Sequence, residues 1–188
     1  MKSFTMYDKQ NAKSPANEML AAVESSIGFV PNVFAAIAES PVSLKAFIEL
    51  NTQFNESSFD ATSHQIIQLA VSVENQCTYC VAGHTAFSEM QKVPVDIVNA
   101  MRNNQPLEDS KLEALNQFTR TLVNSKGPIP EKETKKFLDA GYTHNHVIEV
   151  ILGICVKTFS NLTNNIIGLE LDEPFRPYAW NPENQKAA

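Results

Sequence analysis

The chain has 188 residues, a formal net charge of -6 and a sequence pI near 5.2. This length suits one domain with a substantial core, or two closely packed halves. The acidic balance argues against nucleic-acid and anionic-membrane surfaces, because both select clustered lysines and arginines. No stretch reaches the roughly 20 apolar residues of a membrane span, and residues 1–20 lack the apolar core of a signal peptide. Three cysteines with one close pair do not form a secreted disulfide framework. We therefore expect a cytoplasmic protein that binds neither membranes nor nucleic acid.

Helical periodicity continues along almost the whole chain, and no segment alternates at the period of a strand. Ser14-Pro15 and Ser40-Pro41 each place proline after a capping side chain, as is typical of a first helical turn. Asp60 and Thr143 are further N-cap candidates. The sequence predicts an all-α fold with loose tails at residues 1–13 and 181–188. The expected helices lie near 15–26, 31–39, 41–55, 61–74, 76–91, 94–103, 109–125, 130–139 and 144–168.

An internal similarity divides this helical map into two halves. Residues 66–71 (IIQLAV) align without a gap with residues 147–152 (VIEVIL), and a capped helix start precedes each block. In this alignment Cys80 falls on Asn161, so only the first half carries the Cys-x-x-Cys pair. The pattern predicts a degenerate duplication, although two buried helices of similar apolar composition would give the same pattern. The chain is then a single domain, 1–188, with a cysteine-bearing half (14–92), a degenerate second half (93–180) and a tail (181–188).

The chemically most informative segment is Cys77-Thr-Tyr-Cys80-Val-Ala-Gly-His84. On a helix with about 100° per residue, Cys80 lies about 60° and His84 about 20° from Cys77 around the axis, so the three share one face. A thiolate is the reactive form of cysteine, and a helix N-terminus or a positive neighbour lowers the pKa of the thiol. The spacing therefore indicates dithiol redox chemistry with His84 as a base.

Other chemistries fit the two cysteines less well. A Cys-x-x-Cys pair is also a common half of a zinc site, but here a fourth ligand such as Cys155 or a water would be needed beside Cys77, Cys80 and His84. Attachment of c-type haem requires histidine directly after the second cysteine, where Val81 stands. Cys155 lies in an apolar stretch and is expected to be buried. Neither a resident metal nor a cofactor is expected.

Residues 65–85 (QIIQLAVSVENQCTYCVAGHT) resemble the signature of the AhpD-like superfamily, which holds the alkylhydroperoxidases and the carboxymuconolactone decarboxylases. A looser similarity extends to residues 28–34 and 141–180, as in the branch described as peroxidase-related proteins. The resemblance implies an all-helical fold, a homo-oligomer (dimer, trimer or hexamer) and a Cys-x-x-Cys centre that reduces hydroperoxides by cycling between dithiol and disulfide.

The resemblance also implies roles for the three motif residues. Cys80 attacks the peroxide oxygen, Cys77 resolves the resulting sulfenic acid into a disulfide, and His84 helps to deprotonate Cys80. The substrate would be a small hydroperoxide, and an unidentified thiol reductant would restore the dithiol. Two other functions remain open, namely a redox-responsive dithiol module with little turnover and a zinc-stabilised structural helix.

The chain departs from the family pattern at two positions. Gln65 stands where the family's peroxidases usually have a glutamate that relays protons with the histidine, and an amide cannot relay a proton. Glu74, one turn before Cys77, is a candidate replacement for that carboxylate, and Glu149, a lone acid in an apolar run, could pack near the site. Tyr79 stands between the cysteines where the alkylhydroperoxidases often have histidine. The decarboxylase branch generally lacks the Cys-x-x-Cys pair, so its presence argues against lactone decarboxylation.

Overall fold

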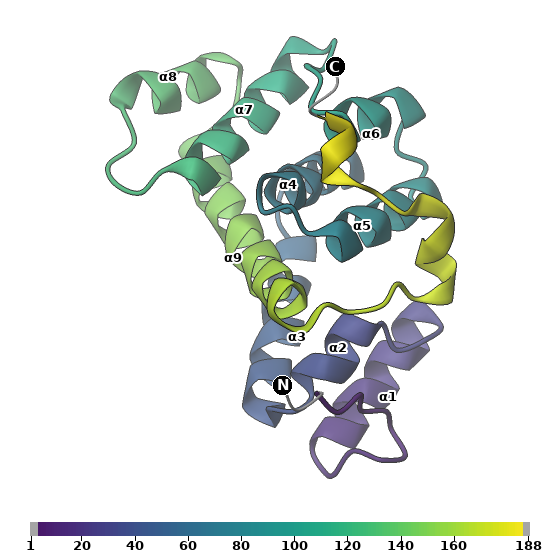
Figure 1. The fold of residues 1–188 in the computed structure, drawn as a ribbon. Coiled ribbons are helices and arrows are strands. Elements are labelled where there is room, and N and C mark those ends of the chain that lie inside the picture. Colours follow the sequence, from purple (N-terminus) through teal and green to yellow (C-terminus); the bar gives the residue numbers. More distant parts are fainter. Residues whose placement is uncertain (1–3, 186–188) are drawn as a thin grey trace.

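The computed structural model describes residues 4–185, and all regular secondary structure in this part of the chain is helical. The predicted all-α class is confirmed, and each of the nine expected helices is present with ends within a few residues of those expected (Figure 1). Two short 3-10 helices near the C-terminus were not expected. The elements are α1 (Ala16–Ile27), α2 (Asn32–Ile37), α3 (Pro41–Asn55), α4 (Ala61–Glu74), α5 (Thr78–Met90), α6 (Val95–Arg102), α7 (Ser110–Asn124), α8 (Glu131–Asp139), α9 (His144–Ile167), η1 (Glu173–Tyr178) and η2 (Pro182–Gln185).

Three of the four predicted capping residues behave as expected, whereas Ser14 does not, because Pro15 is the N-cap of α1 and no side chain caps that helix. Ser40, Asp60 and Thr143 are the N-caps of α3, α4 and α9, and each side chain accepts a hydrogen bond from a backbone N–H of the first turn. Thr143 also forms a capping box with His146. Gly28 and Gly168 end α1 and α9 at positive φ, where a residue with a Cβ would be strained.

Helix α4 lies at the centre of the molecule (Figure 1). It packs against α5, α6, α7 and α9, and its residues from Gln65 to Val73 are all buried. This explains why the α4 sequence is apolar around most of its circumference instead of along one stripe.

Helix α9 is one continuous helix of 24 residues that contacts α2, α3, α4, α5 and α7 (Figure 1). Its close approach to α3 and α4 depends on Gly153, where an added Cβ would stand 2.6 Å from a ring carbon of Phe54 and 2.8 Å from Ile67. In the alignment of the two halves, the break between α4 and α5 corresponds to a position inside α9, where the helix continues without a break. The internal duplication therefore stays a prediction that the helix boundaries do not decide.

By length and hydropathy alone, α9 would be long enough and apolar enough to cross a membrane. One such helix is weak evidence, because core helices of globular domains meet the same criteria. The side of α9 that packs against α3, α4 and α5 carries several buried polar residues, which a helix surrounded by lipid would not favour.

The segment after α9 runs along α5 to the neighbourhood of α6 (Figure 1). Phe175 of η1 is buried against the ring of Phe87 and against Gly83, where an added Cβ would stand 3.2 Å from the Phe175 ring. Trp180 donates its indole N–H to the backbone oxygen of Arg102 at 2.9 Å. Residues 182–185 of the predicted tail form η2, and residues 186–188 lie outside the described residues.

Candidate active site

The two motif cysteines lie at the start of α5, directly after a sharp change of direction. Gln76 adopts a left-handed backbone conformation, with φ of 50°, between α4 and α5. Cys77 is the N-cap of α5, and its Sγ accepts a hydrogen bond from the backbone N–H of Cys80 at 3.4 Å. Both cysteines are free thiols with almost no exposed surface. The turn therefore places the pair at the positive end of the helix dipole.

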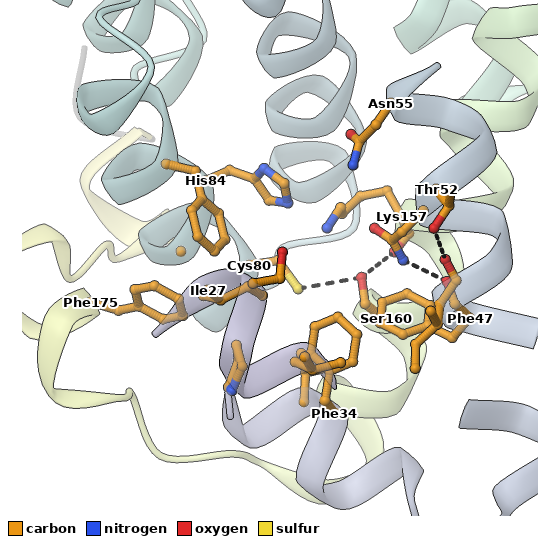
Figure 2. A pocket seen from close by; sticks show the side chains of 18 of the residues that line it. Ile27, Phe34, Phe47, Thr52, Asn55, Cys80, His84, Lys157, Ser160 and Phe175 are labelled. Atoms are coloured by element: carbon orange, nitrogen blue, oxygen red, sulfur yellow. Dashed lines mark hydrogen bonds between the residues drawn. The ribbon is translucent and has the colours of Figure 1, made fainter. Parts of the chain in front are cut away.

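A cavity of about 520 Å³ opens beside α5, and Cys80 lines its wall whereas Cys77 does not. Figure 2 shows Cys80, His84 and Lys157 pointing into it, with the rings of Phe34 and Phe47 nearby. Further apolar lining comes from side chains of α1, α3, α5 and η1, among them Met19, Ile27, Ile48, Phe87 and Phe175. Cys80 is therefore the thiol that a small apolar molecule in the cavity would meet.

His84 lies one helical turn after Cys80 and lines the same cavity. Its Nδ1 is 2.9 Å from Gln65 Oε1, and Gln65 Nε2 donates to Gln91 Oε1 at 3.0 Å. In this arrangement the Gln65 oxygen is an acceptor, so Nδ1 carries the proton and Nε2 is a free lone pair. Burial, together with the positive charge of Lys157, lowers the pKa of His84 well below its ordinary value. The imidazole is therefore neutral at neutral pH.

Four polar residues of α9 face the cysteines, and the sequence reasoning missed their function. Lys157, Ser160, Asn161 and Asn164 recur at helical spacing, and all four are buried. Asn164 Nδ2 donates to Cys77 Sγ at 3.4 Å, and Cys80 Sγ lies 3.9 Å from Ser160 Oγ. The signal in the sequence was this polar face on an otherwise apolar helix.

The surroundings separate the pKa values of the two thiols. Burial raises the pKa of Cys80, but the hydrogen bond from Cys77, the positive charge of Lys157 and hydrogen bonds with Asn161 and Ser160 outweigh burial and lower it to about 7. The pKa of Cys77 is raised, because its thiol donates to Cys80 and is itself buried. Cys80 is therefore the thiolate of the pair at neutral pH, and Cys77 is the thiol.

Tyr79, between the cysteines, has a structural role in this site. Its hydroxyl donates to the carboxylate of Asp172 and accepts a hydrogen bond from the backbone N–H of Val33 at 3.3 Å. Asp172 also accepts from the backbone N–H of Asn32 at 3.1 Å. The Tyr79–Asp172 pair thereby ties α5, the start of α2 and the C-terminal segment together around the cavity.

Neither Glu74 nor Glu149 lies at the site. Glu74 forms a salt bridge with Arg120 of α7 and accepts from Asn124 at 2.7 Å. Glu149 accepts from the backbone N–H of Ser58 at 3.1 Å and from the hydroxyl of that residue. Neither residue lines the cavity. The hypotheses that Glu74 replaces the missing carboxylate and that Glu149 packs near the site are therefore wrong, since both are held by other partners.

Cys155 was expected to be buried, but the structure shows it exposed on α9. It points away from the face of α9 that carries Lys157, since the two positions differ by about 200° around a helix. Within residues 4–185, no group of three or more histidine, cysteine, aspartate or glutamate side chains is arranged to hold a metal ion.

Comparisons with known proteins bear on the fold of the chain. Residues 41–120 match the model of the carboxymuconolactone decarboxylase family. No curated protein matches the chain by sequence. Among solved structures, an uncharacterized peroxidase-related protein with an alkylhydroperoxidase AhpD core, from Ralstonia eutropha JMP134, superposes with a TM-score of 0.82 at 20% identity. That superposition covers 92% of this chain and 93% of the other.

Two further structures are similar over most of their length. A peroxidase-related protein from Silicibacter sp. TM1040 has a TM-score of 0.77 at 16% identity, over 88% of each chain. The debrominase Bmp8 has a TM-score of 0.75 at 17% identity, over 88% of this chain and 90% of the other. A variant of that debrominase is known in complex with 2,3,4-tribromopyrrole. These likenesses establish the shared AhpD-like fold.

Proposed function

We propose that this chain, which has the AhpD-like fold, is a thiol-dependent peroxidase that cycles Cys77 and Cys80 between dithiol and disulfide. The observation that carries the proposal is the position of Cys80, a thiol of lowered pKa on the wall of an apolar cavity, with a second thiol beside it. A cysteine that is both ionised and accessible to a small molecule is the nucleophile that peroxide reduction requires.

The reaction balances with the two thiols alone. The Cys80 thiolate attacks the outer oxygen of ROOH, the S–O bond forms as the O–O bond breaks, and Cys80 becomes a sulfenic acid. The alkoxide takes up the proton that the Cys80 thiol released on ionisation, which gives ROH. Cys77 then attacks the Cys80 sulfur, forming the disulfide and releasing water. A thiol reductant, itself oxidised to a disulfide, returns the pair to the dithiol.

His84 serves as a neutral hydrogen-bond acceptor in this proposal. Its Nδ1 is held by Gln65, so Nε2 is the nitrogen left to accept a hydrogen bond from the peroxide. A base with such a low pKa does not hold a proton at neutral pH. The amide at position 65 thus fixes the tautomer of His84 without relaying a proton.

The lining of the cavity favours an organic hydroperoxide over hydrogen peroxide. Most lining side chains are apolar, and four phenylalanine rings are among them (Phe34, Phe47, Phe87 and Phe175). Burial of an apolar substituent against these rings contributes binding free energy that hydrogen peroxide cannot gain. We also propose a cytoplasmic setting and a homo-oligomeric state, which would suit an enzyme re-reduced by cellular thiols.

The test is consumption of cumene hydroperoxide under a dithiol reductant by the native protein, Cys77→Ser and Cys80→Ser. We expect Cys80→Ser to be inactive and Cys77→Ser to react once and stop at a sulfenic acid. Cys155→Ser is the matched control and should retain activity, because Cys155 lies outside the cavity. Equal activity in Cys80→Ser and the native protein would refute the proposal. Stoichiometric oxidation without turnover would favour a redox-responsive module instead.

A second candidate is reductive dehalogenation of a halogenated aromatic compound. The observation that favours it is the cluster of rings around Cys80, which suits a flat aromatic substrate, together with the shared fold of a debrominase. Two thiols supply the two electrons, so that an aryl bromide and the dithiol give the arene, bromide, a proton and the disulfide. Release of bromide from a brominated pyrrole, absent in Cys80→Ser, would support this activity.

A further inference from the structure

Lys157 is a buried lysine whose function neither the fold nor the motif explains. It has 5% of its surface exposed and comes from the middle of α9, yet it lines the cavity together with Cys80 and His84 (Figure 2). No carboxylate among the described residues forms a salt bridge with it. A buried ammonium group without an opposite charge is strongly disfavoured, so its retention at this place requires a partner.

The titratable groups around Lys157 leave one partner of opposite charge. The cavity lining contains no aspartate, glutamate or arginine, and its titratable side chains are Tyr79, Cys80, His84 and Lys157. Tyr79 is neutral because burial raises the pKa of its phenol, and His84 is neutral because burial and Lys157 lower its pKa. Burial also lowers the pKa of Lys157, and the negative charges of Cys80 and Cys77 counteract that effect. The charge that can balance the ammonium group is therefore a thiolate.

We propose that the reduced site holds an ion pair between the Cys80 thiolate and the Lys157 ammonium group, and that Lys157 is the catalytic acid that protonates the leaving oxygen. The acid role rests on the proposed peroxidase function, whereas the ion pair does not. Ser160 and Asn161, one turn further along α9, complete the polar surface that faces Cys80.

The proton balance of the first step fits this assignment. The thiolate attacks the outer oxygen of ROOH, the S–O bond forms as the O–O bond breaks, and RO⁻ leaves. Lys157 gives its proton to that oxygen, which yields ROH and a neutral amine. The two charges of the ion pair disappear in the same step, so the buried site never carries an unpaired charge.

The second step keeps the site neutral. The Cys77 sulfur attacks the Cys80 sulfenic acid, the S–O bond breaks, and the Cys77 proton joins the departing hydroxide to give water. The oxidised site then contains the disulfide and the neutral Lys157 amine. Reduction of the disulfide by an external dithiol returns a proton to Lys157 when Cys80 becomes a thiolate again.

His84 does not take this acid role, because burial and the charge of Lys157 hold its pKa well below the ordinary value. Its ring proton is assigned to Nδ1 from the contact of 2.9 Å with the Gln65 oxygen, so Nε2 has no proton to give at neutral pH. Gln65 itself is not acidic. Lys157 thus supplies both the positive charge and the proton that the histidine and amide cannot supply.

Two variants separate the charge of Lys157 from its proton. Lys157→Met has a side chain of similar length without a charge, and Lys157→Arg keeps the charge but does not release a proton near neutral pH. Both variants are made in the Cys155→Ser background. The first readout is the alkylation rate of Cys80 by iodoacetamide, which depends on the thiolate and not on any peroxide.

We expect alkylation at pH 7 to slow by about tenfold or more in Lys157→Met, because removal of an adjacent opposite charge shifts a pKa by about 1–3 units. Lys157→Arg should be alkylated near the rate of the parent protein. Alkylation of Lys157→Met at the parent rate, with its helical circular dichroism intact, would overturn the ion pair.

The second readout is the rate of a single oxidation by cumene hydroperoxide. We expect Lys157→Arg to lose about 10²-fold in this rate although it keeps its thiolate, since general acid catalysis is typically worth about 10²–10⁴-fold. Oxidation of Lys157→Arg as fast as the parent would overturn the acid role. A third outcome separates the two proposals. If the parent protein does not react with the peroxide, the peroxidase function and the acid role both fail. If the Lys157→Met substitution still slows the alkylation of Cys80 in that case, the ion pair is supported.

Discussion

Cys80 differs from Cys77 in two properties. It lines the cavity, and its pKa is lowered to about 7 although burial alone would raise it. Cys77 is equally close to the N-terminus of α5 but has a raised pKa, because it donates to Cys80. The hydrogen bond from Cys77 and the positive charge of Lys157 therefore outweigh the position within the helix dipole.

This difference predicts the pH dependence of thiol reactivity. Because the pKa of Cys80 is depressed, its reactive form is present above pH about 7 and is lost as the pH falls through that value. In the Cys155→Ser background, the alkylation rate by iodoacetamide should therefore rise with pH around a midpoint near 7, and Cys80→Ser should lack this phase. A midpoint near the ordinary value of about 8.5 would contradict the assignment.

The residues of the site differ in how readily the sequence predicts them. Cys77, Cys80 and His84 could be found because their contacts are local, within two turns of one helix. Gln65 was identified only through the family resemblance, and the structure places its amide on His84. Lys157 could not be found by spacing from the motif, since it reaches the site from a helix distant in sequence.

At the scale of elements, α9 has an unusual distribution of side chains. Its buried face carries Lys157 and the three polar residues near the cysteines, whereas its exposed face carries apolar side chains. The usual rule that apolar residues face inward predicts the helix but assigns its faces wrongly. The same rule led to the expectation that Cys155 is buried. A helix that lines a polar site and also has an apolar outer face falls outside that rule.

The crossing of α9 over α3 and α4 yields a prediction about stability. An added methyl group at position 153 would meet Phe54 at 2.6 Å and Ile67 at 2.8 Å, and both neighbours are buried. Gly153→Ala should therefore lower the free energy of unfolding by about 1–3 kcal/mol, even though alanine favours helices by about 1 kcal/mol. Urea unfolding measures this difference.

Gly127→Ala is the matched control, because nothing lies within 4 Å of a Cβ added at that position. Its free energy of unfolding should stay close to that of the native protein. An unchanged or increased stability of Gly153→Ala would mean that α9 can move away from α3 and α4 at little cost.

At the scale of the whole molecule, the exposed face of α9 bears on the expected homo-oligomer. Ile148, Ile151, Leu162 and Ile166 are each at least 43% exposed and, with Cys155, fall within an arc of about 60° on the helix. We call these five residues the α9 apolar row. A symmetric pair of chains that packs the two rows together would bury it, since identical surfaces meet at a two-fold axis.

The expected assembly can be measured by light scattering after size-exclusion chromatography. We expect the molar mass of the native protein to exceed that of one chain. The Ile151→Lys substitution should shift the molar mass towards that of the monomer, because a buried lysine would oppose the pairing of the rows. Val42→Lys is the control, since Val42 is 81% exposed on α3, outside the row. A native monomer would contradict the expected oligomer, and an unchanged assembly in Ile151→Lys would exclude the row as its interface.

The central claim is that Cys77 and Cys80 act as one redox pair, and disulfide mapping after oxidation tests it most directly. Reduced protein is treated with one equivalent of cumene hydroperoxide, alkylated and digested, and its cysteine peptides are identified by mass. The account predicts a Cys77–Cys80 disulfide, detected as a peptide mass that is lower by two hydrogens. It also predicts one equivalent of the alcohol product and a Cys155 that is alkylated as a free thiol. Unmodified motif cysteines, or Cys155 in the major disulfide, would contradict the account.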